Sequence, residues 1–164
     1  MLKEMLDKQF ITQEFYNWLI ENGFKSAPAS TKYHGAYKGG LYDHSCAVTY
    51  RLLDFEKLHW QLERSPYIIG MFHDLCKIDA YKEKLDDTGG YERNDKQMIK
   101  GHGDKSVMLL SQFMRLTEEE MLCIRYHMGA YIKEDWDGFD LAIKKYPNVL
   151  FTHTADMLAS KLDV

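Results

Sequence analysis

One stretch of the sequence, residues 68–79 (IIGMFHDLCKID), constrains the fold most strongly. It predicts an apolar helix that carries His73, Asp74 and Lys77 at its polar end. An imidazole and a carboxylate on an otherwise buried helix need polar partners. A divalent metal ion would satisfy both, because neutral imidazole and carboxylate oxygen are common ligands of transition metals. For this pair alone, the simpler alternative to a metal site is a helix end at which Asp74 is hydrogen-bonded and His73 packs against the core.

The spacing of apolar residues predicts an all-α fold. Only three prolines occur, and long stretches place apolar residues three and four positions apart. At 164 residues the chain fits one domain, 1–164, which can bury a core without disulfides or a structural metal. We expect a single-domain helical bundle on which residues 1–25 pack as a helical extension. A Gly-Gly turn flanked by charged residues predicts an excursion or a short two-stranded hairpin near residues 84–95.

The helix boundaries follow from capping and breaking residues. Thr117 and Glu120 form a capping-box pattern, and Pro66 suits the first turn of a helix. Residues 26–40 are predicted to be an ordered loop over the core. The expected helices cover about 2–22 (one helix or two joined near Thr12), 41–60 (with Asp43 as a possible cap), Ser65 through the His73-Asp74 pair, a stretch that begins at 101–103, Thr117 to Gly129, 136–146 and 148–162.

Charge and cysteine content limit the partners and the compartment. A net charge of −4 and a pI near 6.0 argue against long nucleic acid as a partner but allow a small phosphorylated substrate. No apolar run approaches the roughly 18 residues of a membrane span. Cys46, Cys76 and Cys123 lack zinc-type spacing, so we expect reduced thiols and a cytoplasmic location. The sequence gives no indication of the oligomeric state.

Further His and Asp residues recur at helix ends or on apolar helix faces. One candidate per helix suits a bundle in which inward-facing side chains converge on a buried metal site. His153 lies three residues before one of them, on the same helix face. The candidate ligands are His44, His73, Asp74, His102, His127 and Asp156.

In this order of residues the chain resembles the HD-domain superfamily of metal-dependent phosphohydrolases. The superfamily pattern is His, then His-Asp, then a distant Asp, and it matches His44, His73-Asp74 and Asp156 here. The segments GGLYDH, HDLCK and THTAD are similar to those of its bacterial branch. His102 in GHG and His127 in YHMG match the extra positions of members that bind two metals. The resemblance spans roughly residues 33–159.

This resemblance implies metal-assisted hydrolysis at phosphorus. A cage of imidazoles and carboxylates leaves metal positions open to water, which is activated for in-line attack. Asp74 is the expected bridge between two ions, and Lys77 would hold a phosphate oxygen, so both are expected to be catalytic. Cys76 stands where many relatives have Gly, which can alter the fit near the phosphate. His153 is expected to hydrogen-bond to a ligand rather than to bind metal itself.

We therefore expect a hydrolase of a nucleotide or other small phosphoester with one or two divalent ions (Mn, Fe, Ni, Co, Zn or Mg). The alternatives are a phosphodiesterase acting on cyclic nucleotides or RNA 3′ ends, and an inactive metal-binding sensor module. His34 and Arg93 are the expected substrate contacts beside Lys77, and the 84–95 excursion is either a lid or an exposed decoration. Further candidates for contact with a base or phosphate are Tyr33, Tyr37, Tyr91, Tyr131 and Trp136.

Overall fold

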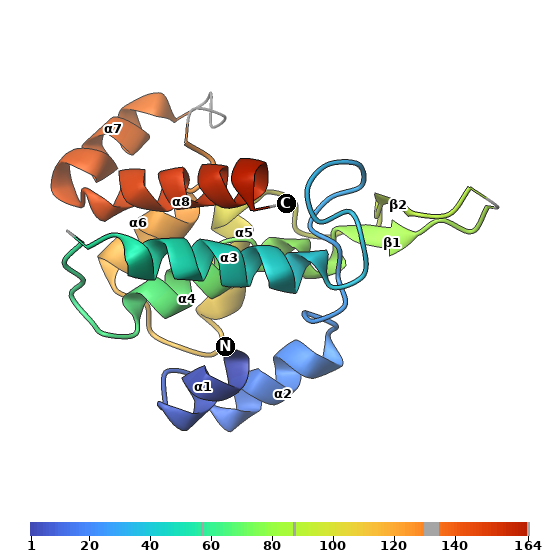
Figure 1. Ribbon diagram of the computed structural model, residues 1–164, viewed down its shortest axis with the longest axis horizontal. Coiled ribbons are helices and arrows are strands. Elements are labelled where there is room, and N and C mark those ends of the chain that lie inside the picture. Colours follow the sequence, from blue (N-terminus) through green and yellow to red (C-terminus); the bar gives the residue numbers. More distant parts are fainter. Residues whose placement is uncertain (57, 87, 130–134, 164) are drawn as a thin grey trace.

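The computed structural model describes residues 1–56, 58–86, 88–129 and 135–163. Helices dominate this part of the chain, and its sheet has two strands (Figure 1). The prediction of a mainly helical fold is confirmed. Within these described ranges, no helix is both long and apolar enough to cross a bilayer. The elements are α1 (Leu2–Asp7), α2 (Gln13–Glu21), α3 (Gly40–Asp54), α4 (Ser65–Phe72), the 3-10 helix η1 (Leu75–Asp79), β1 (Tyr81–Glu83), β2 (Tyr91–Arg93), α5 (Gly103–Leu110), α6 (Glu118–Arg125), α7 (Trp136–Lys145) and α8 (Asn148–Leu162).

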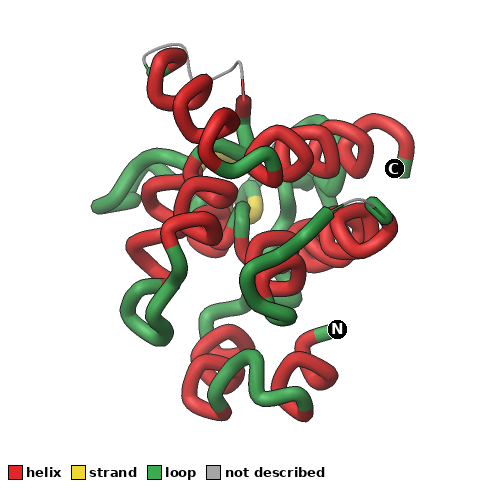
Figure 2. The backbone as a smooth tube through the Cα atoms, turned by 90° about the vertical axis from the view of Figure 1, so that its left-hand side faces the viewer, coloured by secondary structure: helices red, strands yellow, loops and turns green. Residues whose placement is uncertain are grey.

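The core lies between α3, α4, α5, α6 and α8, which pack against one another in pairs (Figure 1). Helices α1 and α2 lie together below this group (Figure 2). They share its core, because the buried ring of Phe15 in α2 lies 5.1 Å from the ring of Phe72 and 4.7 Å from that of Phe113. Burial of three aromatic rings at this junction fixes the N-terminal helices to the rest of the bundle.

The N-terminal region is two helices, the second of the two arrangements expected from the sequence. The Thr12 hydroxyl accepts a hydrogen bond from the backbone N–H of Phe15 at 3.1 Å and so caps α2. Helix α6 begins with the predicted capping box of Thr117 and Glu120, and α8 has the predicted bounds. Capping groups satisfy backbone donors that a helix leaves free at its start, which is why they mark these boundaries.

Helices α3 and α4 approach each other closely at a glycine. A Cβ atom added at Gly70 of α4 would lie 2.5 Å from the Cα atom of Thr49 and 2.8 Å from its backbone nitrogen. Real Cβ atoms do not come this close to backbone, so only glycine permits the observed separation of the two helices. The contact matters because α3 carries His44 and α4 leads directly into His73.

Several predicted boundaries are wrong. Helix α3 ends at Asp54 rather than near 60, and the Asp43 side chain does not cap it. Helix α4 stops at Phe72, so the His73-Asp74 pair follows the helix and leads into the 3-10 helix η1. A hydrogen bond explains why the α-helix stops here. The Cys76 N–H donates to the Ser106 hydroxyl at 3.0 Å instead of to a carbonyl of the preceding helical turn. Helix α6 likewise ends at Arg125, two residues before His127.

The predicted hairpin is present and projects from the helices (Figure 1). Its antiparallel strands pair Tyr81 with Arg93 and Glu83 with Tyr91, so β1 begins before the predicted 84–95 range. Gly89 and Gly90 have positive φ angles, as the turn requires. The hairpin places Arg93 beside η1, where it can take part in a site.

Candidate metal centre

The structure brings the predicted ligands from five parts of the chain to one place. His44 lies in the first turn of α3, and its Nε2 atom lies 3.0 Å from Oδ1 of Asp156 in α8. The Nε2 atom of His73 lies 3.3 Å from that of His44 and 3.8 Å from the same Asp156 oxygen. These three ligand atoms lie within 4.8 Å of one another, which is close enough to share a metal ion.

Asp74 lies between this triad and the two remaining histidines. Its Oδ2 atom lies 3.5 Å from His73 Nε2 and 3.9 Å from His44 Nε2. Its other oxygen, Oδ1, lies 3.4 Å from His127 Nε2 and 3.9 Å from His102 Nδ1. The two oxygens of one carboxylate thus face two different pairs of imidazoles, an arrangement suited to bridging two ions.

Backbone carbonyls orient two of the imidazoles. The Nδ1 atom of His73 donates to the carbonyl of Gly70 at 2.8 Å, and Nδ1 of His127 donates to that of Ile124 at 2.7 Å. Because a carbonyl only accepts, Nδ1 carries the proton in each ring, and the neutral ring has its lone pair on Nε2. Each lone pair therefore faces Asp74 and the other ligands, as metal binding requires.

The Nε2 atom of His127 supports the fit of a metal ion. It is fully buried and has no hydrogen-bond partner among the described residues. A buried polar atom without a partner is costly, and native proteins rarely leave one unsatisfied. The donor set of imidazole nitrogens and carboxylate oxygens is the one that Zn, Fe, Ni and related ions select, so the residues fit the predicted cofactor.

The electrostatics of the site favour ionised carboxylates and a neutral His73 ring. Burial opposes a charge on His127, but Asp74 outweighs burial and raises the pKa of that ring above its ordinary value. Burial lowers the pKa of His73 to about 4, so the ring is neutral at pH 7. Burial alone would raise the pKa of Asp74, but Lys77 and the surrounding imidazoles outweigh it and hold that pKa well below its usual value. For Asp156, burial is likewise outweighed by the hydrogen bond from His44 and by nearby imidazoles, and its pKa is lowered to about 2. Both residues are therefore available as ligands.

Lys77 contacts the predicted bridge directly. Its Nζ atom lies 2.6 Å from Asp74 Oδ2, and both side chains are buried. Burial opposes the charge on this amine, but Asp74 outweighs burial and raises the pKa of Lys77 above its ordinary value. The amine is thus positive and is held at the edge of the ligand cluster.

A cavity of about 470 Å³ opens beside the cluster, a size within the ordinary range for small-molecule sites. His34 lines it, with its ring 4.8 Å from that of His44 and its buried Nε2 atom unpartnered among the described residues. Burial lowers the pKa of His34 to about 4, so this ring too is neutral. The lining residues are Ala29, Ser30, Tyr33, His34, Asp74, Lys77, Tyr81, His102, Met128, His153, Asp156, Met157, Ser160 and Lys161.

The other predicted contact residues lie elsewhere. Arg93 lines a second cavity next to the first, whereas Tyr91 borders neither of these two and Trp136 is half exposed on α7. Tyr37 donates to Asp43 at 3.0 Å, outside the larger cavity. Tyr131 lies outside the described residues. His153 donates from Nδ1 to the backbone carbonyl of the candidate ligand His127 at 2.8 Å, so it contacts that residue through its backbone and not through its ring.

Cys76 occupies a position that the sequence did not mark as a ligand. Its Sγ atom lies 4.0 Å from Asp74 Oδ1 and belongs to a second mutually close set of donors with Asp74 and His102. Burial raises the pKa of this thiol to about 12, which keeps it protonated in the absence of an ion. The only signal in the sequence was its departure from the Gly of many HD-domain proteins.

Comparisons of the chain with protein-family models, with curated proteins and with solved structures find no match. What the protein does is therefore inferred from the residues and geometry of the site.

Proposed function

We propose that this protein is an HD-type metal-dependent phosphohydrolase that cleaves a nucleotide or another small phosphoester. The observation that carries the proposal is the position of Asp74, whose two oxygens face two pairs of imidazoles while Lys77 lies 2.6 Å from one of them. A site that only held a structural metal would need neither a shared carboxylate nor a cation next to it. Both suit two-metal hydrolysis of a phosphate ester, in which the shared carboxylate would hold two ions and the cation would balance developing charge.

The metal ligands divide into two groups around the shared carboxylate. The residues His44, His73, Asp74 and Asp156 would hold one ion, and Asp74, His102 and His127 a second. When bound, such ions supply a water of lowered pKa and polarise the phosphoryl oxygens. The imidazole-rich first group favours Zn, Fe or Ni over Mg, which prefers oxygen ligands.

The chain's own residues bind and orient the substrate. The Lys77 amine lines the cavity next to the ligands, where it would hold a phosphate oxygen and balance the charge that develops during attack. The neutral ring of His34 packs against His44 and lines the cavity, where it would donate or accept a hydrogen bond with the substrate. Burial of His44, His73, Asp74 and His127 lowers the local dielectric constant, which strengthens these interactions.

The site's surroundings favour a small substrate in a reducing compartment. A cavity of about 470 Å³ takes a molecule of nucleotide size, and the net charge of −4 disfavours long nucleic acid. All three cysteines are free, as in proteins of the cytoplasm, where we place this enzyme.

The proposal is tested by turnover of metal-stripped protein reloaded with Mn, Fe, Co, Ni or Zn. The panel contains nucleoside mono-, di- and triphosphates, cyclic nucleotides and a generic phosphodiester, because cleavage of diesters would use the same residues. We expect phosphate release, or opening of the cyclic diester, that depends on metal and is lost in His73→Ala. The matched control is His59→Ala, which removes an exposed imidazole that is not a proposed ligand. Among the described residues, the backbone carbonyl of His59 accepts a hydrogen bond from Asn148, and the substitution keeps that carbonyl. Full activity in His73→Ala at equal metal content would refute the proposal.

A further inference from the structure

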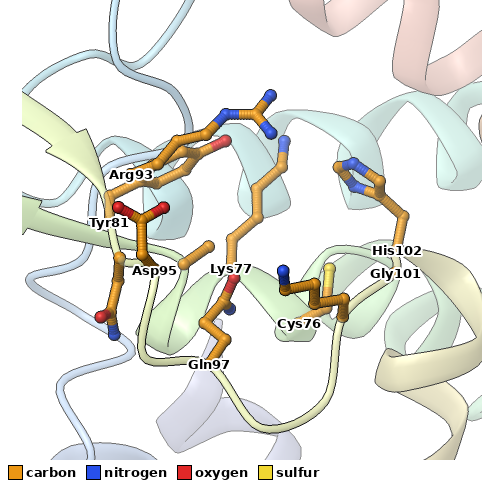
Figure 3. Close-up of a pocket in the computed structure, with 11 residues that line it drawn as sticks. Cys76, Lys77, Tyr81, Arg93, Asp95, Gln97, Gly101 and His102 are labelled. Carbon is orange, nitrogen blue, oxygen red and sulfur yellow. The ribbon is translucent and has the colours of Figure 1, made fainter.

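We propose that the cavity bounded by η1, β2 and residues 94–102 is a second anion subsite, which binds another phosphate group of the substrate. The inference rests on the proposed function and names its substrate class: small molecules with two phosphate groups, one cleaved at the metal centre and one held here. Figure 3 shows this cavity. Its lining residues are Cys76, Lys77, Ala80, Tyr81, Arg93, Asn94, Asp95, Gln97, Lys100, Gly101 and His102.

The cavity adjoins the metal centre. Lys77, Tyr81 and His102 line both this cavity and the larger one, so one substrate can reach both. Its volume is about 170 Å³, room for roughly five or six waters at liquid density. That space suits one phosphate group with some hydration rather than a nucleoside, which leaves the larger cavity for the rest of the substrate.

The charge of the lining favours an anion. Lys77, Arg93 and Lys100 are cationic, and Asp95 is the one carboxylate among the lining residues, although the chain as a whole has a net charge of −4. Neither Arg93 nor Lys100 forms an ion pair with any residue that the structure describes. In Figure 3 the Arg93 side chain runs across the top of the view and the Lys77 side chain runs upward toward its charged end. Guanidinium and ammonium groups placed in this way are typical phosphate ligands.

A network centred on Asp79 holds the wall of the cavity in place. The Gln97 amide donates to Asp79 Oδ1 at 2.9 Å, and the Asn94 amide donates to the Asp79 backbone carbonyl at 2.9 Å. Buried Lys105 of α5 binds the same carboxylate oxygen at 2.5 Å and neutralises it. Residues 94–97 are thereby fixed to η1, which carries Lys77, while strand pairing with Tyr81 fixes Arg93. A site built in this way requires little ordering when an anion binds.

The first test measures binding without turnover. Inorganic phosphate and pyrophosphate are titrated by calorimetry into metal-free protein, into Arg93→Ala/Lys100→Ala, and into Lys96→Ala. Lys96 is the matched control, since it is an exposed cation of the same segment that does not line the cavity. We expect phosphate affinity to fall about 100-fold in the double variant, because two charge-assisted bonds are lost and each contributes about one factor of ten. An equal loss of phosphate affinity in the double variant and in Lys96→Ala, or no binding of phosphate to the wild-type protein, would overturn the proposal.

The second test separates a substrate phosphate from free phosphate. Metal-loaded protein is compared on a nucleoside 5′-monophosphate and the matching 3′,5′-bisphosphate. We expect kcat/KM to favour the bisphosphate, and the double variant to remove this preference while Lys96→Ala keeps it. Binding of free phosphate with no preference for the bisphosphate would refute the assignment to substrate. Because the first test needs no catalysis, a protein that binds phosphate through Arg93 and Lys100 but hydrolyses nothing would refute the proposed function and leave the subsite intact.

Discussion

The substitution Gly70→Ala should damage the metal centre although Gly70 is not itself one of the proposed ligands. The added Cβ would lie 2.5 Å from the Cα atom of Thr49, whereas ordinary contacts of this kind are 3.4–4 Å. Helices α3 and α4 must therefore separate by roughly 1 Å, a shift on the scale that disrupts catalytic geometry. His44 and His73 lie on either side of this contact with their Nε2 atoms 3.3 Å apart, so the ligands would move with the helices.

The magnitude follows from two opposing terms. Overpacking of a core costs about 1–3 kcal/mol, and Ala recovers about 1 kcal/mol through its higher helix propensity, which leaves a net loss of at most about 2 kcal/mol. Metal ligands tolerate displacements of only about 0.2 Å, so metal affinity should fall much further than stability does. We expect a loss in rate of roughly 100-fold at fixed metal concentration.

Three measurements check this prediction: urea unfolding of the metal-free protein, metal binding by competition with a chromophoric chelator, and turnover. Gly138→Ala is the matched control in α7, because the three atoms nearest to its Cβ would belong to the side chains of Asp135 and Tyr126 and not to the backbone. Thr49→Ala should not rescue Gly70→Ala, since the clash includes backbone atoms. Normal metal affinity in Gly70→Ala, or full rescue by Thr49→Ala, would refute the reasoning.

Three further outcomes are expected. Lys77→Met should lower kcat by roughly 100-fold, a typical loss for removal of one group that stabilises transition-state charge, and steady-state kinetics at equal metal content would detect it. The metal-free protein should lose unfolding free energy as pH falls from about 6.5 to about 4, because the unfolded chain binds a proton at His73 that the folded chain, with its pKa of about 4, excludes; the His73 contribution is roughly 3 kcal/mol. In urea unfolding, His73→Asn should make the pH profile less steep and leave the part that comes from His34, whose pKa is also about 4. Shortening the hairpin loop between residues 84 and 90 should raise KM more than it lowers stability, and unchanged kinetics would mark the loop as decoration.

Local sequence signals predicted much of this fold because they act within one helix. Thr12 and Thr117 cap helices through hydrogen bonds to residues three positions away, so their role is visible in the sequence. The bounds of α8 follow from its apolar spacing after Pro147. The end of α4 was not visible, because it depends on a bond from Cys76 to Ser106, thirty residues away.

The candidate site likewise combines features that the sequence predicts with features that depend on distant contacts. The motif residues of the ligand set could be identified from their order, and the structure brings His44, His73 and Asp156 together with Asp74. The placement of Cys76 near Asp74 and His102 could not be identified, since it requires the 3-10 turn of η1. The separate cavity beside Arg93 likewise depends on hairpin register and on the contacts of Asp79, which no periodicity encodes.

Anomalous diffraction from crystals of the metal-loaded protein tests the central claim most directly. We predict two peaks, one among His44, His73, Asp74 and Asp156 and one beside Asp74 towards His102 and His127, with elemental analysis giving two ions per chain. A protein that is active and saturated with metal but has no peak at the first position would contradict the account.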